Sequence, residues 1–134
     1  MKPLLQLNRQ RPATLRQKQS EFARMLPLLI QFAIQQGYEV TLGDAWAFNF
    51  WPIVTLINRF LSRNRLKGLK ARIHSRKSFH YKRLAIDLNL FKNGKYLRST
   101  KAHQPLGEFW ETIGGTWGGR FKSPDGNHYS LGEK

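Results

Sequence analysis

Apolar side chains recur at helical spacing between Thr14 and Gln36, where they would share one face of an α-helix. Thr14 followed by Gln17 has the pattern of a capping box, which favours a helix start at this point. Pro27 lies inside the pattern, so we expect it to kink the helix or to divide it in two. Gly37 follows the last apolar position and is expected to end the helix.

Two stretches have the composition of β-strands. Tyr38 to Leu42 alternates between polar and apolar residues, and Leu84 to Phe91 is apolar enough for a buried strand. After the second stretch, Asn93-Gly94 predicts a tight hairpin turn into a short strand around Tyr96.

Two further helices are expected, one from Pro52 to about Asn64 and one from Pro105 to Ile113, which Gly114-Gly115 would end. With the strands, they indicate an α+β fold. The 134 residues suffice for one small domain, expected over residues 13–134, and residues 1–12 are expected to form a flexible basic leader. No apolar run is long enough to span a bilayer or to form a signal peptide, so we expect a protein made in soluble form.

Charge and cysteine content narrow the possible chemistry. There is no cysteine, so a metal would have to be held by histidine and carboxylate side chains. The formal net charge of +15 attracts polyanions, and Arg59 to Arg83 holds ten Lys or Arg and no acid. This basic tract is either a solvated face or an attachment site for anionic envelope polymers or lipids. Nucleic acid is the weaker alternative, because no nucleic-acid-binding motif is visible.

Two short segments could carry catalysis. The first contains His80 and Asp87, and the second, near the end of the sequence, contains Asp125 and His128. Two histidines and one carboxylate would leave a tetrahedral zinc with an open position for water, and a second carboxylate could act as general base. Spacing alone leaves the alternative of ordinary loop histidines and turn aspartates open.

The motifs around these residues are more specific. Ser78-x-His80, Ala85-x-Asp87 and Asp125-x-x-His128 resemble the signature of the zinc D-alanyl-D-alanine and L-alanyl-D-glutamate peptidases, in particular their small phage endolysin branch. The similarity extends over roughly residues 15–45 and 72–132. Its most characteristic stretches are 37–43, 84–91, 105–110 and 114–121.

The resemblance implies a hedgehog/D,D-peptidase-like fold, in which helices flank an antiparallel sheet, and a zinc peptidase domain. It assigns His80, Asp87 and His128 as Zn²⁺ ligands and Asp125 as the catalytic base. Ser78 would contact substrate or orient its loop, with backbone capping as the alternative. Independently of the resemblance, Trp117 lies between two glycine pairs, which permit close approach of a chain, so it either lines the cleft and binds substrate or belongs to the core.

The sequence also departs from the family pattern. The wider family usually has glycine where Arg83 stands, and Trp46-Ala47 replaces a Tyr-Arg pair that is common in phage relatives. Arg72 or Arg76 could take over the role of that arginine. The remaining histidines, His74 and His103, are expected to be solvated loop residues. For His74, a supporting role behind the metal ligands is the alternative.

The expected function is hydrolysis of the peptidoglycan stem peptide, at the L-alanyl-D-glutamate bond or, alternatively, as a D-alanyl-D-alanine carboxypeptidase. A non-catalytic basic protein that binds envelope or nucleic acid, with a degenerate metal site, is the hypothesis from a different class. The enzyme is expected to be a monomer that reaches the cell wall through a holin-type pore or in a virion.

Overall fold

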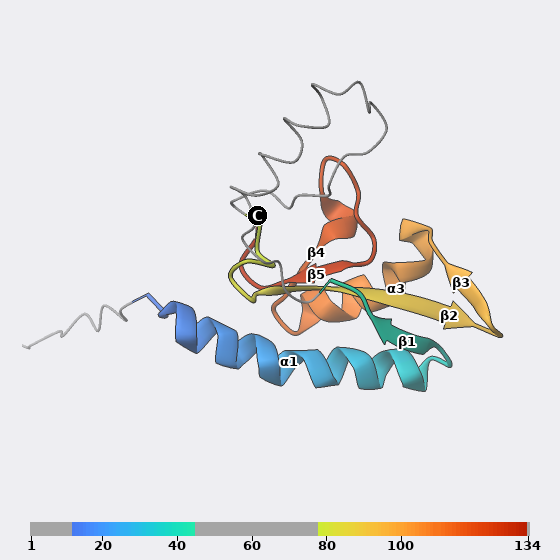
Figure 1. The fold of residues 1–134 in the computed structure, drawn as a ribbon, viewed down its shortest axis with the longest axis horizontal. Coiled ribbons are helices and arrows are strands. Elements are labelled where there is room, and N and C mark those ends of the chain that lie inside the picture. Colours follow the sequence, from blue (N-terminus) through green and yellow to red (C-terminus); the bar gives the residue numbers. More distant parts are fainter. Residues whose placement is uncertain (1–11, 45–77, 134) are drawn as a thin grey trace, which may run out of the picture.

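The computed structural model describes residues 12–44 and 78–133 (Figure 1). The predicted leader, the predicted helix from Pro52 to Asn64, Trp46-Ala47 and most of the basic tract therefore lie outside the described residues. The elements along the chain are α1 (Leu15–Gln35), β1 (Glu39–Leu42), β2 (Ala85–Lys92), β3 (Lys95–Leu97), α3 (Thr100–Thr112), β4 (Thr116–Trp117), the 3₁₀ turn η1 (Gly118–Arg120) and β5 (His128–Ser130).

Helix α1 begins where the capping box predicts. The Thr14 hydroxyl accepts a hydrogen bond from the Gln17 N–H, and the Gln17 side chain accepts one from the Thr14 N–H. The helix continues through Pro27, so the expectation that this residue divides it is wrong. Pro27 is exposed, and water can therefore reach the carbonyl that loses its helical partner.

The strands form one antiparallel sheet in the order β1-β2-β5-β4, with β3 also paired to β2. β2 is central: Val40 pairs with its Leu90, and its Asp87 pairs with His128 of β5. Alternation along β2 buries Ile86, Leu88 and Leu90, and places Asp87 on the opposite face. This arrangement confirms the predicted antiparallel sheet with helices against it.

The turn between β2 and β3 confirms the predicted hairpin. Asn93 and Gly94 have φ angles of 53° and 70°, and a two-residue turn of this kind requires positive φ at both positions. These residue types adopt such angles at low cost, which explains why the sequence signal was reliable here.

Helix α3 begins at Thr100, five residues before the predicted start at Pro105. Ser99 is its N-cap, and the Ser99 hydroxyl accepts a hydrogen bond from the Ala102 N–H. Across the core, Phe32 of α1 stacks on Phe109 of α3 with ring centroids 4.3 Å apart. None of the helices in the two described ranges is long and apolar enough to cross a membrane.

Candidate metal centre

The pairing of β2 with β5 creates the centre. Asp87 and His128 are direct cross-strand partners, so their side chains project from the same face of the sheet. Their neighbours Ile86 and Tyr129 are also paired, and both are buried in the core. The two metal-binding candidates are therefore attached to a rigid part of the molecule.

The turn that precedes β2 supplies His80. The Ser78 hydroxyl accepts a hydrogen bond from the His80 N–H at 3.3 Å, and the His80 carbonyl accepts one from the Arg83 N–H at 3.0 Å. Arg83 ends this turn with a φ of 55°, in the left-handed region that glycine adopts readily. This conformation is a physical reason for the glycine that the wider family usually has at this position.

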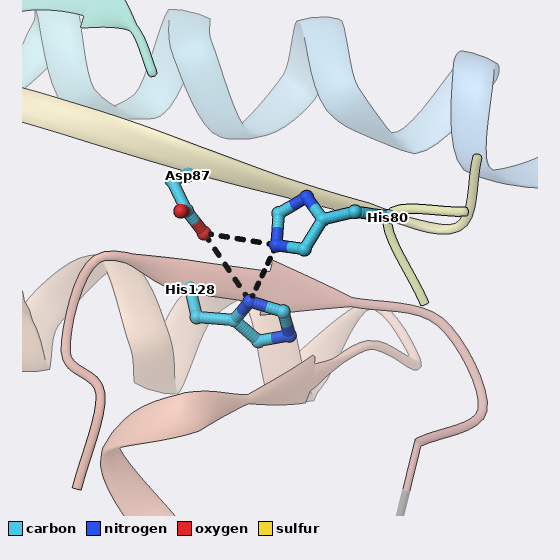
Figure 2. Close-up of side chains that lie close together, drawn as sticks. All are labelled: His80, Asp87 and His128. Atoms are coloured by element: carbon cyan, nitrogen blue, oxygen red, sulfur yellow. Dashed lines mark hydrogen bonds and ion pairs between the residues drawn. The ribbon is translucent and has the colours of Figure 1, made fainter. Parts of the chain in front are cut away.

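Three donor atoms converge at this point (Figure 2). His80 Nε2 lies 3.4 Å from Asp87 Oδ1 and 3.2 Å from His128 Nδ1, and the latter lies 3.2 Å from Asp87 Oδ1. His80 and His128 are only 3% and 6% exposed. The atoms therefore form a nearly equilateral triangle in a site with little access to solvent.

The electrostatics of the centre favour a cation. Burial alone would raise the pKa of Asp87, but the hydrogen bonds and charges of His128 and His80 outweigh it and lower the pKa to about 2. Burial alone would lower the pKa of His128, but its interactions with Asp87 and Glu133 outweigh burial and raise it. The carboxylate is thus ionised, and positive charge is stabilised beside it.

The donor set fits zinc. In a tetrahedral site with bonds of about 2.0 to 2.1 Å, ligand atoms lie about 3.3 to 3.4 Å apart, close to the observed separations of 3.2 to 3.4 Å. Two imidazole nitrogens and one carboxylate oxygen are also ligands that Zn²⁺ prefers. His80, Asp87 and His128 could therefore hold this ion with three protein ligands.

Comparison with known proteins gives the family. Residues 72–131 match the family model described as D-alanyl-D-alanine carboxypeptidase. Residues 72–131 belong to this peptidase family. No curated protein sequence matches the chain significantly.

A solved structure shows the same fold as this chain. The Serratia marcescens L-Ala D-Glu endopeptidase ChiX aligns with a TM-score of 0.56 over 87% of this chain and 82% of its own, at 15% sequence identity. At this identity the similarity establishes the fold, which agrees with the hedgehog/D,D-peptidase-like architecture expected from the sequence motifs.

Asp125 lies in the loop between η1 and β5. Its N–H donates to the Gly118 carbonyl at 2.9 Å, its carbonyl accepts from the His128 N–H at 3.2 Å, and its side chain is exposed. A Cβ on Gly118 would meet the Asp125 carbonyl, so only glycine permits this approach. The carboxylate is not among the three converging donor groups, which is compatible with a base but does not test that role.

Ser78 and Trp117, the two proposed substrate-binding residues, lie in different surroundings. The Ser78 hydroxyl interacts with the backbone of His80, as expected for a residue that orients the loop. Trp117 is 3% exposed in the core and donates from Nε1 to the Gly126 carbonyl at 2.8 Å. This burial favours the core alternative for Trp117 over direct contact with substrate.

The structure corrects the predicted location of His103. It was expected to be a solvated loop residue, but it lies inside α3, is 1% exposed and contacts the Tyr129 hydroxyl through Nδ1 at 3.0 Å. The prediction failed because the start of α3 at Thr100, capped by Ser99, was missed. Burial lowers the pKa of His103, against the opposing effects of the Leu97 carbonyl and the Asp125 charge.

Glu133 was not singled out from the sequence. Its Oε2 lies 2.8 Å from Nε2 of His128, the ring nitrogen that does not face the other two donors. An acidic residue shortly after a candidate ligand is a common pattern, so spacing alone gave no useful signal. The contact depends on a turn at Gly132, whose φ is 81°.

Proposed function

We propose that this chain is a zinc peptidase that hydrolyses the stem peptide of peptidoglycan at the L-alanyl-D-glutamate bond. The observation that carries the proposal is the triangle of His80 Nε2, Asp87 Oδ1 and His128 Nδ1, with its separations of 3.2 to 3.4 Å. A structural histidine pair would not need a carboxylate at equal distance from both rings. The peptidase family of residues 72–131 supports the same conclusion.

The residues have separate tasks in this proposal. His80, Asp87 and His128 hold the ion, and Ser78 keeps His80 in position through its backbone. When bound, Zn²⁺ would supply Lewis-acid chemistry that polarises the peptide carbonyl and activates water. Asp125 is proposed to take up the proton of the attacking water and to pass it to the leaving amine.

The proposed bond follows the resemblance of the sequence motifs to phage endolysins. ChiX, which shares the fold, is an L-Ala D-Glu endopeptidase. A D-alanyl-D-alanine carboxypeptidase is the second candidate, because that activity describes the matching family model. In a phage the enzyme would serve host lysis, and its net charge of +15 would favour contact with anionic envelope polymers.

The two candidate reactions leave different products. Purified peptidoglycan would be digested with the zinc-loaded protein, and the products would be analysed by mass spectrometry. New D-glutamate amino termini would support the endopeptidase, whereas release of free D-alanine would support the carboxypeptidase. If the protein is folded and carries zinc but forms neither product, both candidate reactions are excluded.

The metal assignment has its own test. Replacing His80, Asp87 or His128 with alanine removes one of three ligands, so zinc content and hydrolysis should fall together, with some loss of stability. Glu108→Gln is a matched control, because Glu108 is an exposed acid outside the triangle. A ligand variant that kept full zinc and full activity would remove that residue from the site.

A further inference from the structure

Glu133 and His128 form a contact that the proposed reaction does not use. The Glu133 backbone is held in place, because its carbonyl accepts a hydrogen bond from the Thr116 hydroxyl at 2.7 Å. Two residues earlier, the Leu131 N–H donates to the Leu84 carbonyl at 2.9 Å, which fastens this segment to the start of β2. The segment after β5 therefore places the Glu133 carboxylate beside His128, the proposed ligand on β5.

The contact determines which nitrogen of His128 carries the proton. A neutral imidazole has one N–H, and an ionised carboxylate can only accept hydrogen bonds. With Oε2 of Glu133 at 2.8 Å, the proton of the neutral ring belongs on Nε2, which donates to Glu133. Nδ1 is then left with a lone pair.

That lone pair lies beside the Asp87 carboxylate. His128 Nδ1 is 3.2 Å from Asp87 Oδ1, which is also an acceptor, so the neutral ring and the carboxylate repel unless a proton or a metal ion lies between them. Glu133 thus orients the His128 ring so that Nδ1, the nitrogen with the free lone pair, faces the proposed position of the ion. Because the side chains of His128 and Glu133 are 7% and 23% exposed, water competes only partly for this hydrogen bond.

We infer that Glu133 is a positioning residue for the metal, which holds His128 in the tautomer and orientation needed for coordination through Nδ1. This inference rests on the proposed zinc site. Carboxylates that hydrogen-bond to a ligating histidine orient the ring and increase its basicity, and their removal typically weakens metal binding about 10- to 100-fold. Glu133 itself is not one of the three converging donors.

The test measures metal binding apart from hydrolysis. Zinc dissociation constants would be determined by competition with a chromophoric chelator for the wild-type chain, Glu133→Ala and Glu133→Gln. Glu111→Gln is a matched control, because Glu111 also accepts side-chain hydrogen bonds, from Arg120 at 3.2 Å, but lies outside the centre. The Co²⁺-substituted proteins would be compared by their visible absorption spectra, which report coordination geometry.

We expect Glu133→Ala to weaken zinc binding about 10- to 100-fold and to shift the Co²⁺ spectrum while keeping its tetrahedral intensity. Glu133→Gln should lose less, since its amide oxygen can still accept from Nε2–H, and it serves as the folded variant should the alanine protein be unstable. The control should bind like the wild type.

Three results would overturn the inference. Unchanged zinc affinity in both Glu133 variants, beside a wild-type chain that binds zinc, would remove the role of Glu133 and leave the proposed function intact. Loss of the tetrahedral Co²⁺ spectrum would make Glu133 a ligand rather than a positioning residue. A wild-type chain that binds no zinc would instead overturn the metal site itself, and this role with it.

Discussion

At the scale of single residues, Asp125 differs from the three donor side chains in its surroundings. His80 and His128 are buried, whereas the Asp125 side chain is exposed at the end of a loop whose backbone is fixed by Gly118. An exposed carboxylate on a fixed backbone can reach a substrate without being committed to the ion. Metal binding and proton transfer are therefore separable by substitution.

Asp125→Asn should keep zinc and the fold but lose hydrolysis. The amide cannot accept the proton of the attacking water, and general acid–base groups typically contribute about 10²- to 10⁴-fold. Turnover of a stem-peptide substrate and zinc content would be measured on the same preparations. Loss of zinc would make Asp125 a ligand, and near-normal turnover would place the base elsewhere.

If the base lies elsewhere, Glu108 and Glu111 of α3 are the next acids to consider. Both are engaged by Arg120, which lies 3.2 Å from Glu111 and 3.9 Å from Glu108. This ion pair joins η1 to α3, so a structural role already accounts for both acids. Their variants consequently serve better as controls than as candidates for the base.

Arg83 stores backbone strain in the turn that carries His80. Non-glycine residues at positive φ are disfavoured by roughly 1 to 2 kcal/mol. Arg83→Gly relieves this cost, while Arg83→Ala removes the same side-chain interactions without relieving it. We therefore expect the glycine variant to be more stable than the alanine variant by about 1 kcal/mol in urea unfolding. Equal stabilities, or a more stable alanine variant, would show that the turn is not strained.

At the scale of elements, β5 joins the core to the metal centre. His128 faces the proposed position of the ion, and the next residue, Tyr129, is fully buried, with its hydroxyl against His103 of α3. His103 Nε2 lies 3.3 Å from the Leu97 carbonyl, so its other nitrogen is the acceptor and the Tyr129 hydroxyl donates to it. This chain of hydrogen bonds requires a neutral His103.

His103 should make stability depend on pH. Burial lowers its folded-state pKa below the ordinary value of 6.5, so the unfolded chain binds more protons in the interval between the two values. The stabilising contribution of His103 is thus fully present above pH 6.5 and is lost as the pH falls below it. His103→Gln can keep both hydrogen bonds but does not titrate.

The expected measurement is a difference between two proteins. The free energy of unfolding of the wild type minus that of His103→Gln should decrease between about pH 7.5 and 5, because all other titrating groups are common to both. A difference that stays constant across this range would mean that His103 has a similar pKa in the folded and unfolded states.

The elements also show what could be predicted from the sequence. Caps and turns are local, so the start of α1 at Thr14 and the Asn93-Gly94 hairpin were predicted correctly. Helix α3 was misplaced because Pro105 is typical of a first helical turn, and Ser99 gave the weaker signal. That error also misplaced His103.

The metal centre is not a local feature. Asp87 and His128 are 41 positions apart and meet only through the pairing of β2 with β5. Periodicity cannot give that register, and only the resemblance to a known peptidase family connected the residues. Glu133 was missed for the same reason, because a turn at Gly132 brings it to His128.

At the scale of the whole molecule, charge should govern how the protein meets the proposed insoluble substrate. The formal net charge is +15, and ten of the basic residues lie between Arg59 and Arg83. Salt screens exposed charges over about 8 to 10 Å at ordinary ionic strength. Attraction to an anionic envelope is therefore sensitive to salt, whereas catalysis at a buried centre is much less so.

Binding to whole cell-wall material should weaken as salt rises from about 0.05 to 0.5 M, with hydrolysis of a small soluble peptide nearly unchanged. Reversing several charges between Arg59 and Lys77 should weaken binding in the same way. Reversal of Arg16, Lys18 and Arg24, which are exposed on α1, is the matched control for net charge. Salt-insensitive binding, or an equal effect of both sets, would favour a solvated face over an attachment site.

The direct opposition of Asp87 and His128 also has a consequence for how the sheet is assembled. β5 is only three residues long, and sliding it by one position along β2 would turn His128 to the other side of the sheet. A misaligned β5 would thus remove His128 from the three proposed ligands, and only the correct alignment would gain the full binding energy of the ion. Zinc binding would then stabilise the correctly aligned strand over misaligned forms that hydrogen bonding alone would tolerate.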